Sequence, residues 1–271
     1  MSSLARQSAI VTGAGRGIGR ALAVRLAAQG AHVTLVARTS AQLEKTAAHI
    51  RDAGGEALAF AADLQDPAAI AAAVEAARTR FGPVSILVNN AGIPGPYGPL
   101  GVVDPGEWWA AQEINVRATL LFMAAVLPAM RAARAGRIVN IVSSAGIEPV
   151  PHLSAYAVSK NTVIRLSETV DLEARAAGVR VFALHPGTIT TDMAQLTIGS
   201  PQAQRWLPEG VAMLSNRTPE QSALDLVRCC DVVAALAAGK HDALGGRYLD
   251  LWWDLDARSR AGSEEDAGAS H

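Results

Sequence analysis

The sequence predicts an α/β fold, a doubly wound sheet of about seven parallel strands with helices on both faces. Three observations predict it. Short apolar runs alternate with alanine- and leucine-rich helical stretches over residues 8–252, a glycine-rich turn joins the first apolar run to the first helix, and polar residues follow several of the apolar runs. In a parallel sheet such polar residues meet at the carboxyl edge of the strands, where ligands bind.

The composition fits one large domain. The chain has 271 residues, of which 50% are hydrophobic, enough for a full core. We expect a single domain over residues 1–253, followed by a polar and disordered tail over residues 254–271. The formal net charge is -1, so the chain has no basic surface for nucleic acid, and nucleic-acid binding is disfavoured.

The two cysteines, Cys229 and Cys230, are adjacent, which suits neither a disulfide framework nor a metal site. We therefore expect a reducing, cytoplasmic location and no metal. Residues 1–7 contain no apolar signal core. We also find no run of about 20 apolar residues, so neither secretion nor a membrane span is expected.

Residues 8–12 form the first predicted strand, and the pattern T-G-x-x-x-G-x-G follows it. Gly13 allows a tight turn, Gly17 lets a phosphate approach the backbone at the start of the helix, and Gly19 allows the helix to pack closely on the strand. Ile18 stands where the common G-x-G-x-x-G pattern has its third glycine. A flexible glycine linker is disfavoured here, because an apolar strand and an amphipathic helix flank the turn.

Residues 31–37 form the second predicted strand, and Arg38 follows its end. An acidic residue at that point would bind the adenosine ribose hydroxyls of NAD and repel a 2′-phosphate, whereas an arginine accommodates the phosphate. Arg16 in the glycine turn is a second cation within reach. The pattern favours NADP over NAD, although NAD stays possible if both arginines are simply solvated.

The third and fourth predicted strands, residues 56–62 and 84–88, also end in polar turns. Asp63 follows the third strand, where it could bind the adenine amine, and Leu64 comes next. The turn N-N-A-G at residues 89–92 would lie beside the cofactor, unless its asparagines only stabilise the turn.

The fifth predicted strand, residues 137–142, ends at Ser143, and a helix is predicted over residues 154–176. Tyr156 and Lys160 lie four residues apart on this helix and therefore on the same face. A phenol has an unperturbed pKa of about 10, and an adjacent cation lowers it toward neutral pH. Tyr156 could then pass a proton in either direction, although this spacing also occurs in ordinary helix surface pairs.

The remaining segments surround the same edge of the sheet. After the sixth predicted strand, residues 179–184, a loop over 185–192 could orient a nicotinamide carboxamide. Residues 193–217 are irregular and partly apolar, so we expect a lid over the substrate rather than a plain surface connection. A last strand is predicted over residues 246–252. His152 is interpreted as a loop or substrate-contact residue.

Together these residues resemble the short-chain dehydrogenase/reductase family, in its compact one-domain oxidoreductase branch. The resemblance covers about residues 5–252 and implies a Rossmann-like fold. The motifs that carry it are T-G-A-G-R-G-I-G at 12–19, Asp63, N-N-A-G at 89–92, Asn115, Ser143, Y-A-V-S-K at 156–160 and P-G at 186–187. The last strand departs from the family pattern. We expect its two tryptophans, Trp252 and Trp253, to pack in the core, with a subunit interface or the wall of a substrate pocket as alternatives.

The resemblance implies that Tyr156 is the general acid/base and that Ser143 stabilises the substrate oxygen, with Ser144 the weaker candidate. Lys160 would hold the nicotinamide ribose and lower the Tyr156 pKa, and Asn115 would hold a water that connects Lys160 to solvent. The residues expected to contact the cofactor are Gly13, Arg16, Gly17, Ile18, Gly19, Arg38, Asp63, Leu64, Asn90, Ala91, Gly92, Tyr156, Lys160, Pro186, Gly187, Ile189 and Thr191.

The resemblance thus implies an oxidoreductase that interconverts a ketone or aldehyde and its alcohol, in the first place a carbonyl reductase. Arg38 favours NADP(H) as its cofactor, and the apolar lid segment and the tryptophans suggest an apolar substrate. An NAD-dependent alcohol dehydrogenase of the same family is the alternative. A nucleotide-sensing protein without catalysis is more remote, because Tyr156 and Lys160 are both present. The helices that carry Asn115 and Tyr156 commonly pack at a four-helix interface in the family, which implies a homotetramer, with a dimer as the alternative.

Overall fold

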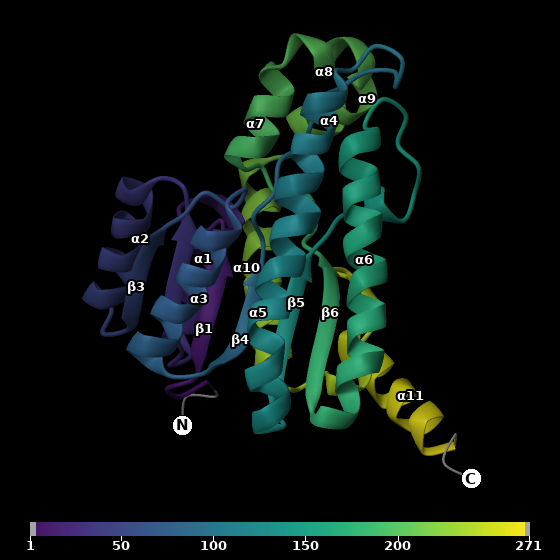
Figure 1. Ribbon diagram of the computed structural model, residues 1–271. Helices are drawn as coiled ribbons and strands as arrows, with labels where there is room; N and C mark the ends of the chain where they lie inside the picture. Colours follow the sequence, from purple (N-terminus) through teal and green to yellow (C-terminus); the bar gives the residue numbers. More distant parts are fainter. Residues whose placement is uncertain (1–3, 269–271) are drawn as a thin grey trace.

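The computed structural model describes residues 4–268, with side chains as far as residue 261. A seven-stranded parallel sheet forms its centre, in the order β3-β2-β1-β4-β5-β6-β7, so the expected fold class is confirmed (Figure 1). The strands are β1 (Ser8–Thr12), β2 (His32–Ala37), β3 (Glu56–Ala61), β4 (Val84–Asn89), β5 (Gly136–Ile141), β6 (Val179–His185) and β7 (Tyr248–Asp250).

Helices cover both faces of this sheet, as Figure 1 shows. The helices are α1 (Gly17–Ala28), α2 (Ser40–Asp52), α3 (Pro67–Phe81), α4 (Pro105–Gln112), α5 (Ala118–Ala133), α6 (Ser154–Ala174), α7 (Asp192–Gly199), α8 (Pro201–Trp206), α9 (Pro208–Ser215), α10 (Pro219–Ala237) and α11 (Leu255–Gly268). Most of these elements begin and end within a few residues of the boundaries that the apolar pattern predicts.

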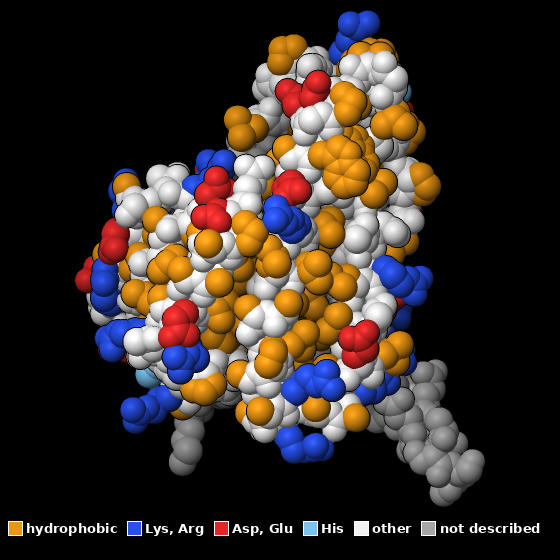
Figure 2. Space-filling view, in the orientation of Figure 1, with side chains coloured by type: hydrophobic (Ala, Val, Ile, Leu, Met, Phe, Trp, Pro, Cys, Tyr) orange, Lys and Arg blue, Asp and Glu red, His pale blue; other side chains and the backbone are white. Residues whose placement is uncertain are grey.

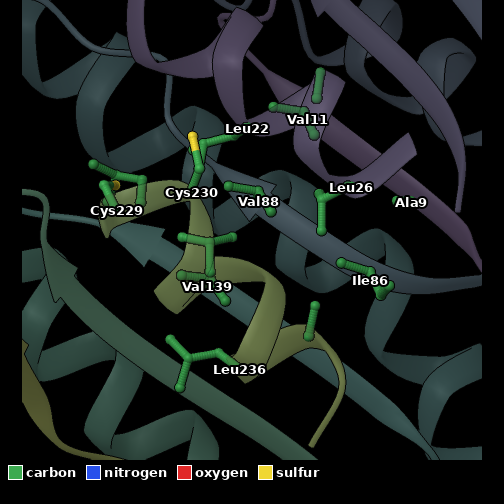
Figure 3. Packing of buried hydrophobic residues seen from close by; sticks show 14 of the residues in the cluster. Ala9, Val11, Leu22, Leu26, Ile86, Val88, Val139, Cys229, Cys230 and Leu236 are labelled. Atoms are coloured by element: carbon green, nitrogen blue, oxygen red, sulfur yellow. The ribbon is translucent and has the colours of Figure 1, made fainter. Parts of the chain in front are cut away.

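Alternate side chains of each central strand enter two apolar layers, because successive side chains point to opposite faces. On one face Val88 packs with residues of α1, α2 and α10, and Figure 3 shows Leu22 and Leu26 of α1 around it. On the other face Leu87 packs with residues of α3, α5 and α6. Cys230, with the neighbouring Cys229, belongs to the first layer. The two thiols are therefore core side chains, and burial raises the pKa of both.

The strand order reverses between β1 and β4, and the ends of these two strands are tied together. The Thr12 hydroxyl accepts hydrogen bonds from the backbone N–H groups of Asn90 and Ala91, both at 3.0 Å, and the Asn90 amide donates back to the Thr12 carbonyl at 3.0 Å. In an open α/β sheet, the point of reversal is where a crevice forms outside the carboxyl ends of the strands.

Two glycines let the glycine turn enter this junction. Gly13 has a φ of +67°, in the left-handed region, and a Cβ there would lie 2.8 Å from the Asn90 side-chain nitrogen. A Cβ on Gly19 would lie 2.3 Å from the Gly13 carbonyl oxygen. A side chain at either position would therefore push α1 away from the ends of β1 and β4.

One continuous helical run, Pro105–Ala133, joins α4 to α5 through a π-helical turn at Glu113–Arg117. The run is 29 residues long, and by length and mean hydropathy alone it could cross a membrane. It is not an uninterrupted apolar run, because Glu113 and Arg117 lie within it. Its buried side chains, among them Phe122 and Val126, pack on the sheet as in a core helix of a globular domain. The π turn places Asn115 between α6 and the loop after β4.

The tail differs from its expectation. Of the residues expected to be disordered, 255–268 form α11, which extends away from the body in Figure 1, and 269–271 lie outside the described residues. Asp254 accepts a hydrogen bond from the Ala257 N–H, Leu255 is buried in the core, and the Arg258 guanidinium lies 3.8 Å from the Trp253 ring centroid. These contacts start a helix in a stretch whose composition alone is typical of disorder.

The last strand and the tryptophans after it are also corrected. The strand β7 has 3 residues, shorter than the predicted 246–252. Trp253 packs against Tyr248 and the core, as expected. Trp252 does not, because its side chain is 49% exposed and lies under the Arg228 guanidinium, 4.8 Å from its ring centroid.

Candidate active site

Two cavities open at the carboxyl edge of the sheet. The large cavity has a volume of about 930 Å³ and lies between the loops after β5 and β6 and the helices α7, α8 and α9. The glycine cleft, of about 310 Å³, lies around the turn after β1. Both are lined by Tyr156, together with Ile18, Val142, Pro186, Thr191 and Met193. The two cavities therefore meet beside the phenol.

The glycine cleft collects most of the residues that the sequence predicts at a dinucleotide site. Those that line it are Gly13, Arg16, Gly17, Ile18, Gly19, Arg38, Asp63, Leu64, Asn90, Ala91, Gly92, Tyr156, Lys160, Pro186 and Thr191. The remaining two, Gly187 and Ile189, line the large cavity instead. These residues come from six different segments of the chain, which the parallel sheet brings to one edge.

The start of α1 is suited to an anion. Arg16 is its N-cap residue and makes no side-chain capping bond, and the first turn contains no acidic residue. The N–H groups at a helix start have no partner within the helix and carry a partial positive charge, so they favour a phosphate. Together with the close glycine turn, this end of α1 fits the pyrophosphate of a dinucleotide.

The two arginines of the cleft differ in their surroundings. Arg38 lines the cleft, is exposed, and forms no hydrogen bond or ion pair with the described residues. Arg16 forms an ion pair with Asp192, the first residue of α7, at 2.9 Å, and both side chains are more than half exposed. Exposed pairs of this kind contribute little free energy, about 0–1 kcal/mol.

Tyr156 and Lys160 lie on one face of α6, as their spacing predicts. The Lys160 Nζ lies 5.5 Å from the centroid of the Tyr156 ring and donates a hydrogen bond to the Ile141 carbonyl at 2.9 Å. Burial raises the pKa of Tyr156 to about 12, and a hydrogen bond with the Ser143 side chain opposes the rise. Burial also lowers the pKa of Lys160 to about 8.

The expectation that Lys160 lowers the Tyr156 pKa below its ordinary value is therefore wrong for this structure. Removing the phenol from water disfavours its anion, and this cost outweighs the hydrogen bond from Ser143. The same burial disfavours the charged form of Lys160. At neutral pH Tyr156 keeps its proton, so the site holds a proton donor next to the two cavities.

Asn115 is the one predicted site residue that lines neither cavity, and it is buried. Its side-chain oxygen accepts a hydrogen bond from the Ile93 N–H at 2.8 Å, and its amide donates to the Ile93 carbonyl and the Ser159 hydroxyl, both at 2.9 Å. Asn115 thus ties the loop after β4 to α6, directly beneath Gly92, which lines the glycine cleft.

Helix α10 holds the loop after β6 in place. The Asp225 carboxylate accepts a hydrogen bond from the Thr188 N–H at 3.1 Å, and the Ser222 hydroxyl accepts one from the Thr190 N–H at 2.8 Å. Asp225 also pairs with Arg217. Two side chains of one helix therefore fix the backbone on which Gly187, Ile189 and Thr191 reach the cavities.

The segment 193–217, expected to be irregular, forms most of α7 and the short helices α8 and α9 above the large cavity (Figure 1). Proline starts both α8 and α9, and the Ser200 hydroxyl caps α8. Bonds to other parts of the protein hold α7 and this segment in place. They include Arg16 to Asp192, Tyr97 to Thr197 at 2.7 Å between hydroxyls, and His152 Nδ1 to the Trp206 carbonyl at 2.6 Å, besides the pair of Arg217 with Asp225.

His152 is held in an unusual backbone conformation. Its φ is +65°, which is uncommon for a residue other than glycine. Its ring contacts that of Trp206, with 5.3 Å between centroids, and its carbonyl accepts a hydrogen bond from the Gly98 N–H. This residue therefore joins three segments that line the large cavity, in keeping with the interpretation of His152 as a loop residue.

Several residues in or beside the cavities were not among the site residues predicted from the sequence. Asp192 pairs with Arg16, Ser159 holds Asn115, and Glu148 and Glu209 are the acidic residues that line the large cavity. Each of these polar residues would be an ordinary solvated side chain if only its neighbours in sequence were considered. Their positions depend on contacts across the fold, such as the pair of residues 16 and 192.

A sequence profile of the short chain dehydrogenase family matches residues 7–200. The chain belongs to this family. Membership makes it an oxidoreductase of alcohol and carbonyl groups, in a family that binds NAD(P).

Individual members are similar over most of the chain. The short chain dehydrogenase tazN of Aspergillus terreus is 36% identical over 93% of this chain, which spans 53% of the length of tazN. The short chain dehydrogenase pigC of Monascus ruber is 32% identical, over 94% of this chain and 81% of its own length. Among solved structures, a variant of actinorhodin polyketide ketoreductase with NADPH has a TM-score of 0.82 and 31% identity, covering 92% of this chain and 97% of its own.

The contacts of His152 predict how this family member holds α8. In His152→Ala, the bond to the Trp206 carbonyl and the ring contact are lost, so we expect faster amide hydrogen exchange in peptides spanning α8 and α9, with β1 and β4 unchanged. Mass spectrometry of exchanged peptides measures this.

His152→Gly is the matched control, because it removes the same contacts but adopts a φ of +65° without strain. It should also speed exchange in α8 and α9, while recovering part of any Tm lost in His152→Ala. Unchanged exchange in both variants would show that His152 does not hold this segment.

Proposed function

We propose that the protein is an NADP(H)-dependent carbonyl reductase that interconverts a ketone or aldehyde and its alcohol. One observation carries the proposal: Tyr156 lies where the glycine cleft meets the large cavity. Its phenol is protonated, forms a hydrogen bond with the Ser143 side chain and lies close to Lys160. A cofactor in the cleft and a substrate in the cavity would then meet beside one proton donor.

The glycine cleft fits a dinucleotide, since its glycine turn brings the backbone close and the uncapped start of α1 favours a pyrophosphate. Asp63 would hold the adenine, and the loop that carries Gly187 and Ile189 would hold the nicotinamide. When bound, the nicotinamide supplies the hydride for carbonyl reduction. The protein supplies the alignment and the proton.

The chain's own part in the reaction is proton transfer. Tyr156 donates its phenolic proton to the carbonyl oxygen as that oxygen gains negative charge, and Ser143 donates a hydrogen bond to the same oxygen. The Lys160 ammonium stabilises the phenolate left behind and would bind ribose hydroxyls from its place in the cleft. Asn115 positions α6, which carries both groups, and we propose that it also keeps a water near Lys160.

The proposed preference for NADP rests on Arg38, which lines the cleft and has no partner among the described residues. In addition, the end of β2 carries no acidic residue. A free guanidinium there would bind a 2′-phosphate through charge-assisted hydrogen bonds. NAD is the second candidate, favoured by one observation: Arg16 already pairs with Asp192. The exposed pair is weak, so a phosphate can displace the carboxylate.

We also propose a homotetramer, with a dimer as the alternative. Hydrophobic side chains gather over α4, α5 and α6 in Figure 2, and Trp109, Leu120, Val158 and Leu172 are exposed on these helices. Such a patch is typical of a protein–protein interface. The cytoplasm remains the proposed location, supported by two adjacent cysteines that are free thiols.

Removal of the phenolic hydroxyl tests the proton donor. In Tyr156→Phe we expect NADPH binding to persist and turnover to fall by about 10²–10⁴-fold, the usual contribution of general acid catalysis. Steady-state kinetics and NADPH fluorescence titration measure the two quantities. Tyr97→Phe is the matched control, since Tyr97 also lines the large cavity but bonds to Thr197, and it should keep turnover within about threefold. Normal turnover in Tyr156→Phe would refute this role.

The raised pKa of Tyr156 predicts opposite pH dependences for the two directions. Reduction needs the protonated phenol, which is present below its pKa of about 12, and the Lys160 ammonium, which is present below its pKa of about 8. The rate should therefore be nearly constant from about pH 6 to pH 7 and decline only as Lys160 loses its charge. Oxidation needs the phenolate, so its rate should rise from about pH 6 to pH 7. Rate profiles in both directions would measure this, and a reduction rate that falls steeply between pH 6 and pH 7 would contradict the raised pKa.

The Arg38 side chain predicts the cofactor preference. Arg38→Asp should weaken NADPH binding by at least about tenfold, or about 1.4 kcal/mol, and change NADH binding much less, because only NADPH has the 2′-phosphate. Arg20→Asp is the matched control, with the same charge change on a residue of α1 that does not line the cleft. Equal losses for both cofactors in Arg38→Asp would show that Arg38 does not read the phosphate.

A further inference from the structure

The large cavity has an unbalanced charge. Two carboxylates line it, Glu148 from the loop after β5 and Glu209 from the first turn of α9, and no lysine or arginine is among its lining residues in the described part of the chain. Neither carboxylate forms an ion pair or a side-chain hydrogen bond with the described residues, and both side chains are exposed. Among the described lining residues, no lysine or arginine balances their negative charge.

Two arginines of the surrounding segments make their contacts elsewhere. The Arg205 guanidinium lies over the Trp206 ring, 4.7 Å from its centroid, and does not line the cavity. Arg16 lines the glycine cleft, where it pairs with Asp192. The basic side chains in the described walls are His152, which is hydrogen-bonded to the Trp206 carbonyl, and His185, whose pKa is lowered by burial.

The remaining walls suit a bulky apolar molecule. A volume of about 930 Å³ is at the upper end of the range for small-molecule sites, and apolar side chains dominate the lining. They include Val150, Leu153, Ile189, Trp206, Leu207 and Met213. An apolar wall lowers the local dielectric constant, which strengthens the repulsion between a carboxylate of the protein and an anionic group on a ligand.

We propose that the large cavity selects bulky, uncharged ketones and rejects those that carry an anionic group, with Glu148 and Glu209 as the residues that exclude the anion. The inference rests on the proposed carbonyl reduction and names the class of substrate at the same site. Unpaired charges that repel the wrong ligand are a common way to obtain specificity without new contacts to the right one. Discrimination by exposed carboxylates should weaken as salt screens them.

A matched pair of ketones tests this proposal. Methyl 6-acetyl-2-naphthoate and its free acid present the same carbonyl and ring system but differ in charge. With the wild-type protein and NADPH, kcat/KM for the ester should exceed that for the acid by about tenfold or more, and high salt should reduce the ratio. In the double variant Glu148→Gln/Glu209→Gln the ratio should fall to within about threefold. In Glu148→Lys/Glu209→Lys it should invert.

Glu173→Gln provides the control, because it removes one exposed acidic charge from α6 at a position that does not line the cavity. Its ester-to-acid ratio should match the wild type. Equal kcat/KM for ester and acid in the wild type, or a ratio unchanged in the double glutamine variant, would overturn the proposal.

A binding measurement separates this proposal from the proposed function. Both compounds are titrated into the wild-type protein with NADP⁺ present, and tryptophan fluorescence reports their dissociation constants. Tighter binding of the ester without reduction of any ketone would refute the proposed reductase function and support the exclusion of anionic ketones. Reduction of 2-acetylnaphthalene together with equal binding of ester and acid would support the reductase function and refute the exclusion of anionic ketones.

Discussion

The close junction of β1 and β4 is the constraint on which the site depends. The Thr12 hydroxyl and carbonyl take hydrogen bonds from Asn90 and Ala91, which draws the carboxyl ends of the two strands together at the point where the strand order reverses. Gly19 then packs so closely on Gly13 that a single methyl group would clash with the backbone. This junction gives the glycine cleft its floor and points the start of α1 into it.

The second half of the sheet brings the reactive groups to the same edge. Strand β5 delivers Ser143, and α6 packs against β6 with Tyr156 and Lys160 on the face that turns to the cavities. Burial then shifts both pKa values. The desolvated Tyr156 phenol keeps its proton more tightly, and the desolvated Lys160 ammonium loses its proton more easily. A phenol that stays protonated suits the proposed reduction, in which Lys160 would stabilise the negative charge left on the phenol oxygen.

What could be predicted from the sequence was local in the chain. The glycine turn and the Tyr156–Lys160 spacing each occupy a few consecutive residues, and the alternation of apolar strands and helices gave the fold class and most element boundaries. The pairing of Arg16 with Asp192, the bonds of Asn115, and the two unpaired carboxylates of the large cavity join residues far apart in sequence. The helix α11 was missed because one buried leucine and one cation–π contact outweigh its polar composition. The direction of the Tyr156 pKa shift was missed because the spacing of residues in the sequence does not show how deeply a side chain is buried.

The central claim is that a nicotinamide in the glycine cleft and a carbonyl in the large cavity react beside Tyr156. The most direct test is to reduce 2-acetylnaphthalene with NADPH deuterated at both positions of nicotinamide C4, in ordinary water, and to analyse the alcohol by mass spectrometry and NMR. The account predicts one deuterium on the carbinol carbon of every product molecule and none elsewhere. Product without deuterium, or the absence of product with NADPH and with NADH, would contradict it.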